Sequence, residues 1–266
     1  MKQCPYSGPN KPEVLDMSKK LSSIEKILLI LKKLSEEPFE FTAKEISKSL
    51  AIPRPTIHRM LNTLEKQNFV KKNGNSSKYS IGYCSYEVGM TYVNRINVYT
   101  EIKDIIDEVA KITRQQVGYT VLENQEVISI YESQFFHIIN IKYDPGKVYN
   151  INCGVYGKVL MAYSKSIKEL EELVYKLELK PVTPRAFTDP DKLLEEYKKI
   201  RRLGYSESDG EYLPGTIGIG APSFRSDGTV HGCVGLAGIK SEDFLNKKHI
   251  YIDEVVKGAN KISKLL

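Results

Sequence analysis

Residues Ile52–Leu61, IPRPTIHRML, bring two arginines, a histidine and a threonine to the start of an apolar helical pattern. Arginine can bond the edge of a guanine base, and hydroxyl groups suit phosphate oxygens. Two prolines make this helix start rigid, because each fixes its own backbone angle φ. The combination favours a helix that enters a groove of DNA over an ordinary surface helix.

The residues around this stretch predict a helix-turn-helix. Thr42 and Glu45 match the capping box T-x-x-E, which opens a short helix over residues 43–50. Ala-Ile-Pro then supplies a three-residue break. The next helix, residues 54–67, carries four apolar residues on its inner face: Ile57, Met60, Leu61 and Leu64. Two short helices separated by such a break, the second one amphipathic, match the motif.

A basic hairpin follows the second helix directly. FVKK and KYSIG predict two short strands around an Asn-Gly turn. Its lysines, Lys71, Lys72 and Lys78, are placed to reach phosphates or the minor groove. A basic hairpin at this point of the chain is the wing of a winged helix-turn-helix.

A further helix is predicted upstream, in LSSIEKILLILKKLSEEP. Ser22 or Ser23 can cap its start, and Pro38 ends it. The helical spacing predicts five residues on its buried face: Ile24, Ile27, Leu28, Leu31 and Leu34.

The distribution of charge supports a polyanion-binding head. Residues 1–82 hold 15 lysines and arginines against 8 acidic residues, a net charge of +7. Residues 83–266 hold 24 against 25, a net charge of −1. All the excess positive charge therefore lies in the first third of the chain, as expected of a DNA-binding module joined to a neutral domain.

Residues 98–266 predict a separate α+β domain, in which helices pack on a largely antiparallel sheet. Two hairpins are expected, in QVGYTVLENQEVISIYES and TIGIGAPSFRSDGTVHGCVGLAGI, and another extended run in HIINIKYDPGKVY. Helices are expected in EIKDIIDEVAKIT, GVYGKVLMAYS, IKELEELVYKLEL, PDKLLEEYKKIRRLGY and EDFLNKKHIYIDEVVKGANKISKLL. Residues 83–97 predict a linker helix, and residues 1–19 a disordered polar tail.

Catalytic and cofactor motifs are missing. GVYGKVL fails the phosphate-loop pattern, because Asn152 stands five residues before Gly157 and Val159 replaces the hydroxyl residue. Ser223, Asp227 and His231 can be drawn as a triad, but no nucleophile motif surrounds that serine. We therefore expect neither an enzyme nor a cofactor.

No metal site is expected either. The histidines show no paired spacing, although His231 and Cys233 are two apart on a strand and could join Cys153 at a metal. A small buried cysteine near a turn histidine is the simpler interpretation. Four scattered cysteines without a CxxC pair indicate free thiols in the cytoplasm. The sequence also lacks a secretory signal pattern and any apolar run of roughly 18 residues, so no membrane contact is expected.

The ordered motifs resemble the IclR-type (isocitrate lyase regulator) transcription factors. TAKEISKSLAIPRPTIHRMLNTLEKQNFV and KYSIG resemble the family's DNA-binding domain. GVYGKVLMAY looks like its Gly-Lys helix, and RRLGYSESDGEYLPGTIGIGAPSFRSDGTVHGCVGLAGI looks like its effector-domain signature. The resemblance covers about residues 20–266. It implies a winged helix-turn-helix domain at 20–82, a linker helix, and a GAF-like effector-sensing and oligomerisation domain at 98–266.

The resemblance also implies which residues contact DNA. Arg59 is the best candidate for a base or phosphate contact, with a salt bridge to Glu45 or Glu65 as the alternative. Family members usually have serine where this chain has Pro55, so a hydroxyl and an amide donor are lost there. The expected DNA-binding residues are Thr42, Arg54, Pro55, Thr56, His58, Arg59, Asn62, Lys71, Lys72, Lys78 and Tyr79.

An effector site is implied in the second domain. Members that bind small acids commonly carry cysteine at the position of Gly218 and serine at those of Gly235 and Ala237. The changes here predict a wider, less polar pocket and a ligand larger or more aromatic than glyoxylate or pyruvate, or one held by Asp209, Tyr156 and backbone amides. The expected effector-binding residues are Cys153, Tyr156, Gly157, Met161, Asp209, Glu211, Gly218, Ile219, Gly220, Gly235 and Ala237.

The sequence therefore predicts a cytoplasmic regulator, a dimer or a dimer of dimers, that binds double-stranded DNA at a palindromic operator. A small organic metabolite is expected to act as effector and to control a metabolic operon. Two alternatives stay open at this point. One is an enzyme domain fused to a DNA-targeting head, and the other is a regulator whose C-terminal domain only oligomerises.

Overall fold

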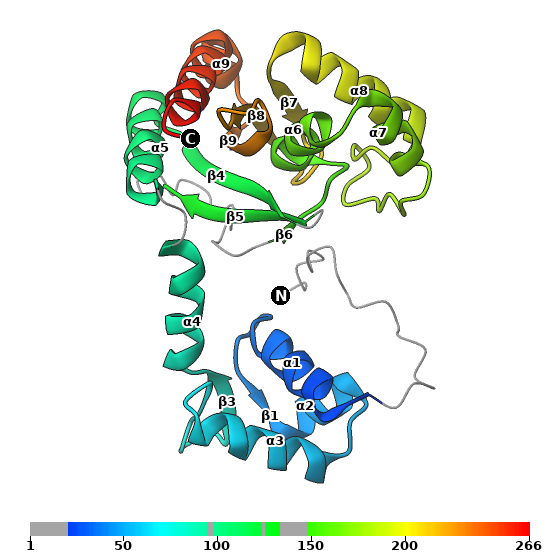
Figure 1. The fold of residues 1–266 in the computed structure, drawn as a ribbon, viewed down its shortest axis with the longest axis vertical. Coiled ribbons are helices and arrows are strands. Elements are labelled where there is room, and N and C mark those ends of the chain that lie inside the picture. Colours follow the sequence, from blue (N-terminus) through cyan, green and yellow to red (C-terminus); the bar gives the residue numbers. More distant parts are fainter. Residues whose placement is uncertain (1–20, 95–97, 124–125, 134–147) are drawn as a thin grey trace. The chain divides into compact units, whose positions relative to one another are not determined.

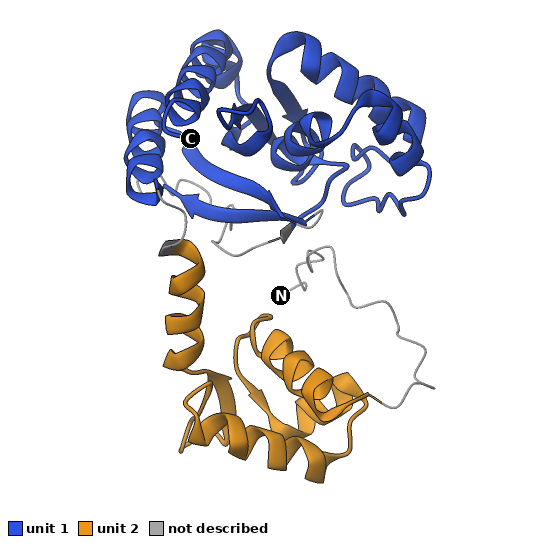
Figure 2. Cartoon of the chain, in the orientation of Figure 1, with its two compact units in different colours: residues 1–11, 98–266 blue, residues 12–97 orange. Residues whose placement is uncertain are grey.

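The chain forms two compact units, which divide between Asn97 and Val98 (Figure 2). The computed structural model describes residues 21–94, 98–123, 126–133 and 148–266. Within these residues, no helix combines the length and the apolar character needed to cross a membrane.

The N-terminal unit is a winged helix-turn-helix (Figure 1). Its three strands form an antiparallel sheet in the order β1-β3-β2. The helix pair and the basic hairpin confirm the sequence prediction, whereas the short first strand was not predicted. The elements are α1 Ser23–Leu34, β1 Phe41–Thr42, α2 Ala43–Leu50, α3 Arg54–Lys66, β2 Val70–Lys72 and β3 Lys78–Ile81.

Local chemistry sets the turn between α2 and α3. Thr42 caps α2, since its hydroxyl accepts from the amide of Glu45 while the Glu45 carboxylate accepts from the amide of Thr42. Ala51 ends α2 in the left-handed conformation, with φ 51°, and Pro53 precedes the first turn of α3. The predicted inner face of α3 is confirmed, because all four of its residues are buried: Ile57, Met60, Leu61 and Leu64.

The predicted buried face of α1 is partly wrong. Ile30 and Leu34 are its buried residues, and Ile27 and Leu31 pack partly against the same core. Ile24 and Leu28 are instead exposed, at 71% and 54%. The core therefore contacts a stripe that is rotated from the predicted one, and two large apolar side chains stay at the surface.

The helix α4, Tyr83–Asn94, follows the wing. None of its described side chains is buried, and Tyr83, Tyr86, Val88 and Tyr92 are exposed. A helix of this length is marginal in water by itself and normally depends on a packed apolar face.

The C-terminal unit is built on one six-stranded sheet in the order β6-β5-β4-β9-β8-β7. Every pair of neighbouring strands is antiparallel, as predicted for this domain. The segment HIINIKYDPGKVY lies outside the described residues except at its end. The strands are β4 Gln116–Glu123, β5 Glu126–Glu132, β6 Val148–Tyr149, β7 Ser206–Asp209, β8 Thr216–Phe224 and β9 Val230–Ile239.

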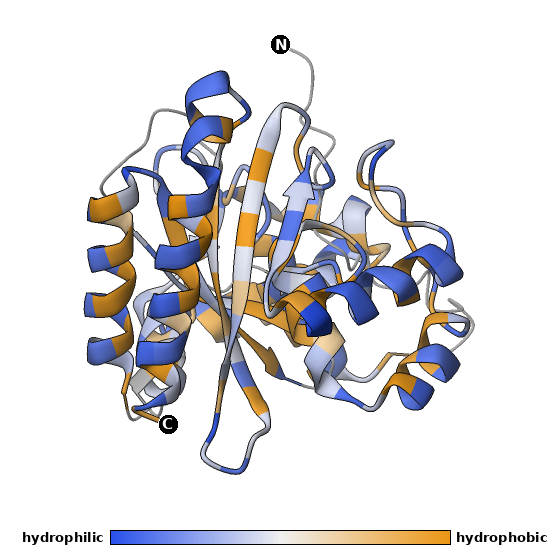
Figure 3. Ribbon diagram, turned by 90° about the horizontal axis from the view of Figure 1, so that it is seen from above, coloured by the Kyte–Doolittle hydropathy of each residue, from blue (hydrophilic) through white to orange (hydrophobic). Residues whose placement is uncertain are grey.

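Helices cover both faces of this sheet. A Cβ built on Gly238 would meet Phe244 of α9, whereas one built on Gly235 would meet Tyr156 of α6, so these helices lie on opposite faces. Several helices alternate hydrophilic and hydrophobic residues along their length (Figure 3). The helices are α5 Tyr99–Thr113, α6 Gly154–Ser164, α7 Ile167–Val174, α8 Pro190–Leu203 and α9 Glu242–Ser263.

The helix termini follow the sequence signals closely. Pro190 occupies the first turn of α8, and Gly204 ends it at φ 79°, as the sequence predicted. Helix α7 ends at Val174 and is therefore shorter than the predicted helix over residues 167–179. Glycine suits the end of α8 because it adopts positive φ without strain.

We expect Thr42→Ala to lower the free energy of unfolding of the N-terminal unit by about 1 kcal/mol, because it removes the cap of α2. The measurement is urea unfolding followed by circular dichroism. Thr63→Ala is the matched control, since the Thr63 hydroxyl only bonds back to the carbonyl of Arg59 within α3. Equal losses in the two variants would contradict the assigned cap.

Candidate functional site

The start of α3 is a basic surface. Arg54, Pro55, Arg59 and Asn62 are exposed, and Thr56 and His58 are half-buried beside them. The guanidinium of Arg54 lies 3.4 Å from Nε2 of His58. The structure therefore brings these predicted DNA-binding residues together on one helix.

No side chain caps the N-terminus of α3, and no acidic residue lies in its first turn. By contrast, α1, α2 and α7 each begin with a capping box that contains a glutamate. Pro55 has no N–H, and the amides of Thr56 and Ile57 donate to the carbonyl of Pro53, so few amides stay open at this end of the helix. Because no carboxylate neutralises the helix dipole there, the start of α3 still favours an anion such as phosphate.

Arg59 makes no ion pair with another residue of the described part of the chain, so the alternative salt bridge with Glu45 or Glu65 does not form there. The Glu45 carboxylate instead accepts from Thr42, and this hydrogen bond lowers the pKa of Glu45. The Arg59 guanidinium is therefore available to another partner.

The wing carries exposed Lys71 and Lys72, and half-buried Lys78 lies on its second strand. Tyr79 differs from the other predicted contacts, because it is 2% exposed and belongs to the hydrophobic core of this unit. Lys72 lies over its ring, 5.7 Å from the centroid. This burial does not fit a direct contact of Tyr79 with DNA. The prediction that Tyr79 binds DNA is therefore corrected: Tyr79 is a core residue.

A small pocket opens in the C-terminal unit between the first turn of α6 and the sheet. Its volume is about 20 Å³. Since about 10–15 Å³ on this measure holds one water molecule, the pocket has room for one or two. Its lining residues are Gly154, Val155, Tyr156, Ser208, Tyr212, Thr216, Ile217, Gly218, Gly235, Leu236 and Ala237.

Four of the predicted effector-binding residues line this pocket: Tyr156, Gly218, Gly235 and Ala237. The others lie outside its lining: Cys153, Gly157, Met161, Asp209, Glu211, Ile219 and Gly220. The sequence reasoning missed the other lining residues: Gly154, Val155, Ser208, Tyr212, Thr216, Ile217 and Leu236. Thr216 could have been found from the sequence, because it lies two residues before Gly218 on the same strand and therefore faces the same side. Ser208 could not, because it lies beside Gly218 only through the pairing of β7 with β8.

The sequence predicted that glycine at positions 218 and 235 would widen the pocket, but the structure shows no added space at either position. A Cβ on Gly218 would lie 3.2 Å from Cγ1 of Val155, and a Cβ on Gly235 would lie 2.2 Å from Cε1 of Tyr156. The space that the two glycines release is therefore filled by side chains of α6.

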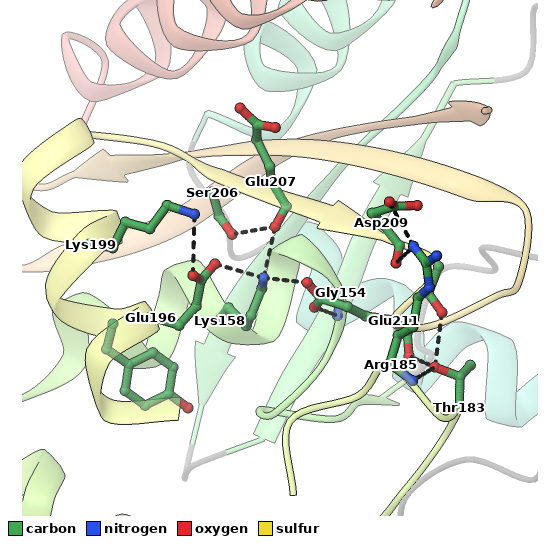
Figure 4. A network of polar contacts seen from close by, with 12 residues as sticks. Gly154, Lys158, Thr183, Arg185, Glu196, Lys199, Ser206, Glu207, Asp209 and Glu211 are labelled. Carbon is green, nitrogen blue, oxygen red and sulfur yellow. Dashed lines mark hydrogen bonds and ion pairs between the residues drawn. The ribbon is translucent and has the colours of Figure 1, made fainter. Parts of the chain in front are cut away.

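A buried cation, Lys158 on α6, is the centre of a network of polar contacts (Figure 4). Its ammonium group donates to the carboxylates of Glu196 and Glu211, at 2.9 and 2.7 Å, and to the carbonyl of Glu207 at 2.7 Å. These three bonds use all three ammonium protons. The network joins α6, α8 and β7.

Glu211 acts in this network and not in the pocket. One carboxylate oxygen accepts from Lys158, and the other accepts from the amide of Gly154 at the start of α6, at 3.0 Å. Burial raises the pKa of Glu211, and the charge of Lys158 opposes the rise. The helix end that would suit an acidic effector is thus occupied by a carboxylate of the chain itself.

Asp209 lies at the surface with two cationic partners. Arg185 and Lys240 approach the same carboxylate oxygen, at 2.7 and 2.6 Å. The hydrogen bond from Lys240, with that from Arg185, lowers the pKa of Asp209. Its carboxylate is therefore held by this ion pair.

Ser223, Asp227 and His231 do not form a triad. The Tyr119 hydroxyl lies between the first and last of them, 2.7 Å from Oγ of Ser223 and 2.6 Å from Nδ1 of His231. The Asp227 carboxylate accepts from the amide and hydroxyl of Thr229. Within the described residues, no cluster of histidine, cysteine and acidic side chains suits a metal ion.

A winged helix-turn-helix unit joined to a second α+β unit defines a DNA-binding regulator of transcription. Residues 23–74 match the family model of the IclR helix-turn-helix domain, and residues 90–264 match that of the bacterial transcriptional regulator IclR C-terminal domain. The chain belongs to the IclR family of transcriptional regulators.

Curated relatives agree with this membership. KdgR of Dickeya chrysanthemi is 25% identical over 264 residues, which cover 95% of this chain and 83% of the relative. KipR of Bacillus subtilis is 24% identical over 243 residues, which cover 91% and 96%. Both are named HTH-type transcriptional regulators and not enzymes.

Solved structures share the fold. An IclR transcriptional regulator from Alicyclobacillus acidocaldarius has a TM-score of 0.79 at 23% identity, with 92% of this chain and 99% of the other covered. An IclR homologue from Microbacterium hydrocarbonoxydans, solved with 4-hydroxybenzoate, has a TM-score of 0.75 at 19% identity, with 90% and 96% covered.

We expect Lys158→Met to lower the free energy of unfolding of the C-terminal unit by about 3–5 kcal/mol, because it leaves the buried Glu211 carboxylate without its cation. The partly buried Glu196 keeps Lys199, at 3.5 Å. Adding Glu211→Gln should recover part of the loss. Lys198→Met is the control, since Lys198 pairs with Glu195 at the surface, and should change little. Calorimetric unfolding measures all four proteins, and equal effects of the two lysine variants would contradict the role of the network.

We also expect the C-terminal unit to lose stability as the pH falls from 6.5 towards 4. Burial lowers the pKa of His231 from 6.5 to about 4. The unfolded chain therefore takes up a proton in this window that the folded chain does not, so acid favours unfolding. Melting temperatures between pH 7 and 4 should depend less on pH in His231→Gln. His249→Gln, a change at an exposed position of α9, should keep the wild-type dependence, and an unchanged slope in His231→Gln would refute the assignment.

Proposed function

We propose that this regulator binds a palindromic operator as a dimer or dimer of dimers and controls a metabolic operon in response to a small organic metabolite. Residues 20–82 bind DNA, residues 83–97 link the units, and residues 98–266 bind the effector and oligomerise. The effector enters the pocket at the first turn of α6.

The observation that carries the DNA-binding proposal is the uncapped, basic start of α3. Exposed Arg54 and Arg59 lie at a helix start that has no acidic residue in its first turn, and they present positive charge where α3 would meet the groove. The wing adds Lys71 and Lys72, which are exposed. Pro55 removes one amide donor from this surface, so Thr56 and Arg54 supply more of the phosphate contacts.

Exposed apolar side chains support self-association. Helix α4 buries none of its described side chains, yet it carries exposed Tyr83, Tyr86 and Tyr92. Ile24 and Leu28 on α1 are also exposed. A second copy of the chain is the partner that would cover such surfaces and, at the same time, supply the second head that a palindrome needs.

An effector would act by shifting a population. A ligand that favours one arrangement of the C-terminal domains changes the distance between the two recognition helices. Both helices read a palindrome only when they lie about 34 Å, one helical turn of DNA, or a multiple apart. The IclR homologue solved with 4-hydroxybenzoate supports a small organic molecule as effector.

A second candidate is a regulator whose C-terminal domain oligomerises and binds no effector, and the observation behind it is the small volume of this pocket. A pull-down of genomic fragments by the pure protein, with and without cell extract, separates the two. Altered recovery of a fragment in extract supports effector control. Equal recovery under both conditions supports oligomerisation alone, and no enriched fragment contradicts operator binding.

We expect Arg59→Ala to weaken operator binding by about 1–3 kcal/mol, which is about 5- to 150-fold, because Arg59 is free to contact a base or a phosphate. Loss of a phosphate contact would also reduce the salt slope by about 1, whereas loss of a base contact would relax specificity at one position. Fluorescence anisotropy at several salt concentrations measures both.

Lys198→Ala is the control, since it removes the same charge from the exposed surface of α8. It should leave operator affinity unchanged. An Arg59→Ala variant with wild-type affinity, specificity and salt slope would show that Arg59 does not contact DNA.

A further inference from the structure

An Asn-Gly pair in the loop of the wing is not explained by the turn that such a pair usually forms. Asn73 and Gly74 are the one Asn-Gly pair of the sequence. The tight hairpin turn that selects this pair requires positive φ at both residues. Here the loop residue with positive φ is Ser77, at 53°, and neither Asn73 nor Gly74 has it.

Packing does not require glycine at this position either. A Cβ built on Gly74 would meet no atom within 4 Å, and the residue is exposed. The backbone and the surroundings would therefore accept alanine, since neither makes use of the missing side chain. Glycine instead leaves its own amide nitrogen open to approach, because no Cβ lies in front of it.

Asn73 carries a reactive carbonyl next to this open nitrogen. Asparagine is among the chemically labile residues. Its Oδ1 accepts a hydrogen bond from the amide of Asn75 at 3.1 Å. A donor on this oxygen polarises the side-chain carbonyl and stabilises the negative charge that an attack on Cγ would place there.

The hydrogen bonds of the loop leave the Gly74 amide unused. The amide of Asn73 donates to the carbonyl of Lys78 at 2.8 Å, and the amide of Ser77 donates to the carbonyl of Asn73 at 3.0 Å. Within the described residues, the Gly74 amide donates to no acceptor. The attacking group and the carbonyl are therefore adjacent in the chain, exposed and not held apart by other bonds.

We propose that Asn73 is a self-modification site, at which the side-chain amide converts to a carboxylate, and that this conversion weakens operator binding. The effect on binding rests on the proposed function. In the first step, the nitrogen of Gly74 attacks Cγ of Asn73, so that an N–Cγ bond forms and a succinimide ring closes. The Cγ–Nδ2 bond breaks, and Nδ2 leaves as ammonia with the proton that the Gly74 amide has lost.

Water opens the ring in the second step. Hydrolysis at Cγ yields aspartate, whereas hydrolysis at the backbone carbonyl yields isoaspartate, in which the main chain runs through the side chain. Asparagine and water thus give a carboxylic acid and ammonia, with no oxidation or reduction. The acid ionises at neutral pH and adds a negative charge to the wing.

The new carboxylate would stand among the cations of the wing. Asn73 directly follows Lys71 and Lys72, which are exposed, and it bonds to the backbone of Lys78. A negative charge at this place opposes the approach of DNA phosphates and offsets the attraction of the lysines. The affinity of the wing for DNA therefore falls as the molecule ages.

Peptide mass spectrometry of the full chain, after incubation in mildly alkaline buffer, tests the chemistry. Asn73 should lose its amide, and faster at higher pH, because the attacking nitrogen must give up its proton. Asn75 is the matched internal control, since it is exposed in the same loop but precedes Ser76, whose Cβ shields the next amide. Gly74→Ala should suppress the loss without destabilising the fold. Equal loss at Asn73 and Asn75, or an equal rate in Gly74→Ala, overturns the proposal.

Fluorescence anisotropy with the operator tests the consequence. Asn73→Asp should bind about fivefold more weakly than wild type, as expected of one exposed charge. Aspartate keeps the oxygen that accepts from Asn75, so charge is the main change. Asn73→Gln stays neutral and should bind like wild type. Equal affinities of the Asp and Gln variants overturn the proposal.

The two measurements also separate this proposal from the proposed function. The incubation contains no DNA, so an intact amide at Asn73 contradicts the modification site alone. Failure of the wild type to bind any operator before incubation contradicts the proposed function, and with it the effect on binding.

Discussion

The buried ammonium group of Lys158 is the interaction on which the C-terminal unit depends. A charge with no exposed surface must be neutralised inside the protein, and here two carboxylates and one carbonyl do so. Because Glu196, Glu207 and Glu211 come from α8, β7 and the loop after it, satisfying one charge fixes three parts of the chain. Glu211 also binds the amide of Gly154, so the same network sets where α6 begins.

The close approach of α6 to the sheet depends on glycine. A Cβ at Gly157 would meet the carbonyl oxygen of Asn150 at 1.9 Å, and one at Gly235 would meet Tyr156 at 2.2 Å. Gly157 thus lets α6 pack against the segment that precedes it, and Gly235 lets the Tyr156 ring of α6 lie against the sheet, which leaves little volume between helix and sheet. At Gly218 and Gly235 the space beside the backbone is filled by Val155 and Tyr156 of the same chain.

The N-terminal unit uses local chemistry instead. Capping boxes with glutamate begin α1 and α2, whereas α3 begins at Pro53 without a side-chain cap. Glutamate at the start of α3 would neutralise the charge that favours phosphate, so its absence there is consistent with DNA binding. Ile24 of α1 and the tyrosines of α4 stay exposed within the described part of this unit.

The sequence by itself determined most helices and strands. Capping boxes, helical spacing, strand alternation and turn residues are signals that depend only on residues a few positions apart in the chain. It predicted the winged helix-turn-helix, the antiparallel sheet and the four buried residues of α3. Only the tertiary structure decided which side of α1 meets the core, that Tyr79 is buried, and that Glu211 serves Lys158. The tertiary structure also decided that the space beside Gly235 is filled by the Tyr156 ring, so that the glycine does not widen the pocket. The missing side chain is local information, but what fills its place comes from Tyr156, 79 positions away, and packing alone brings the two together.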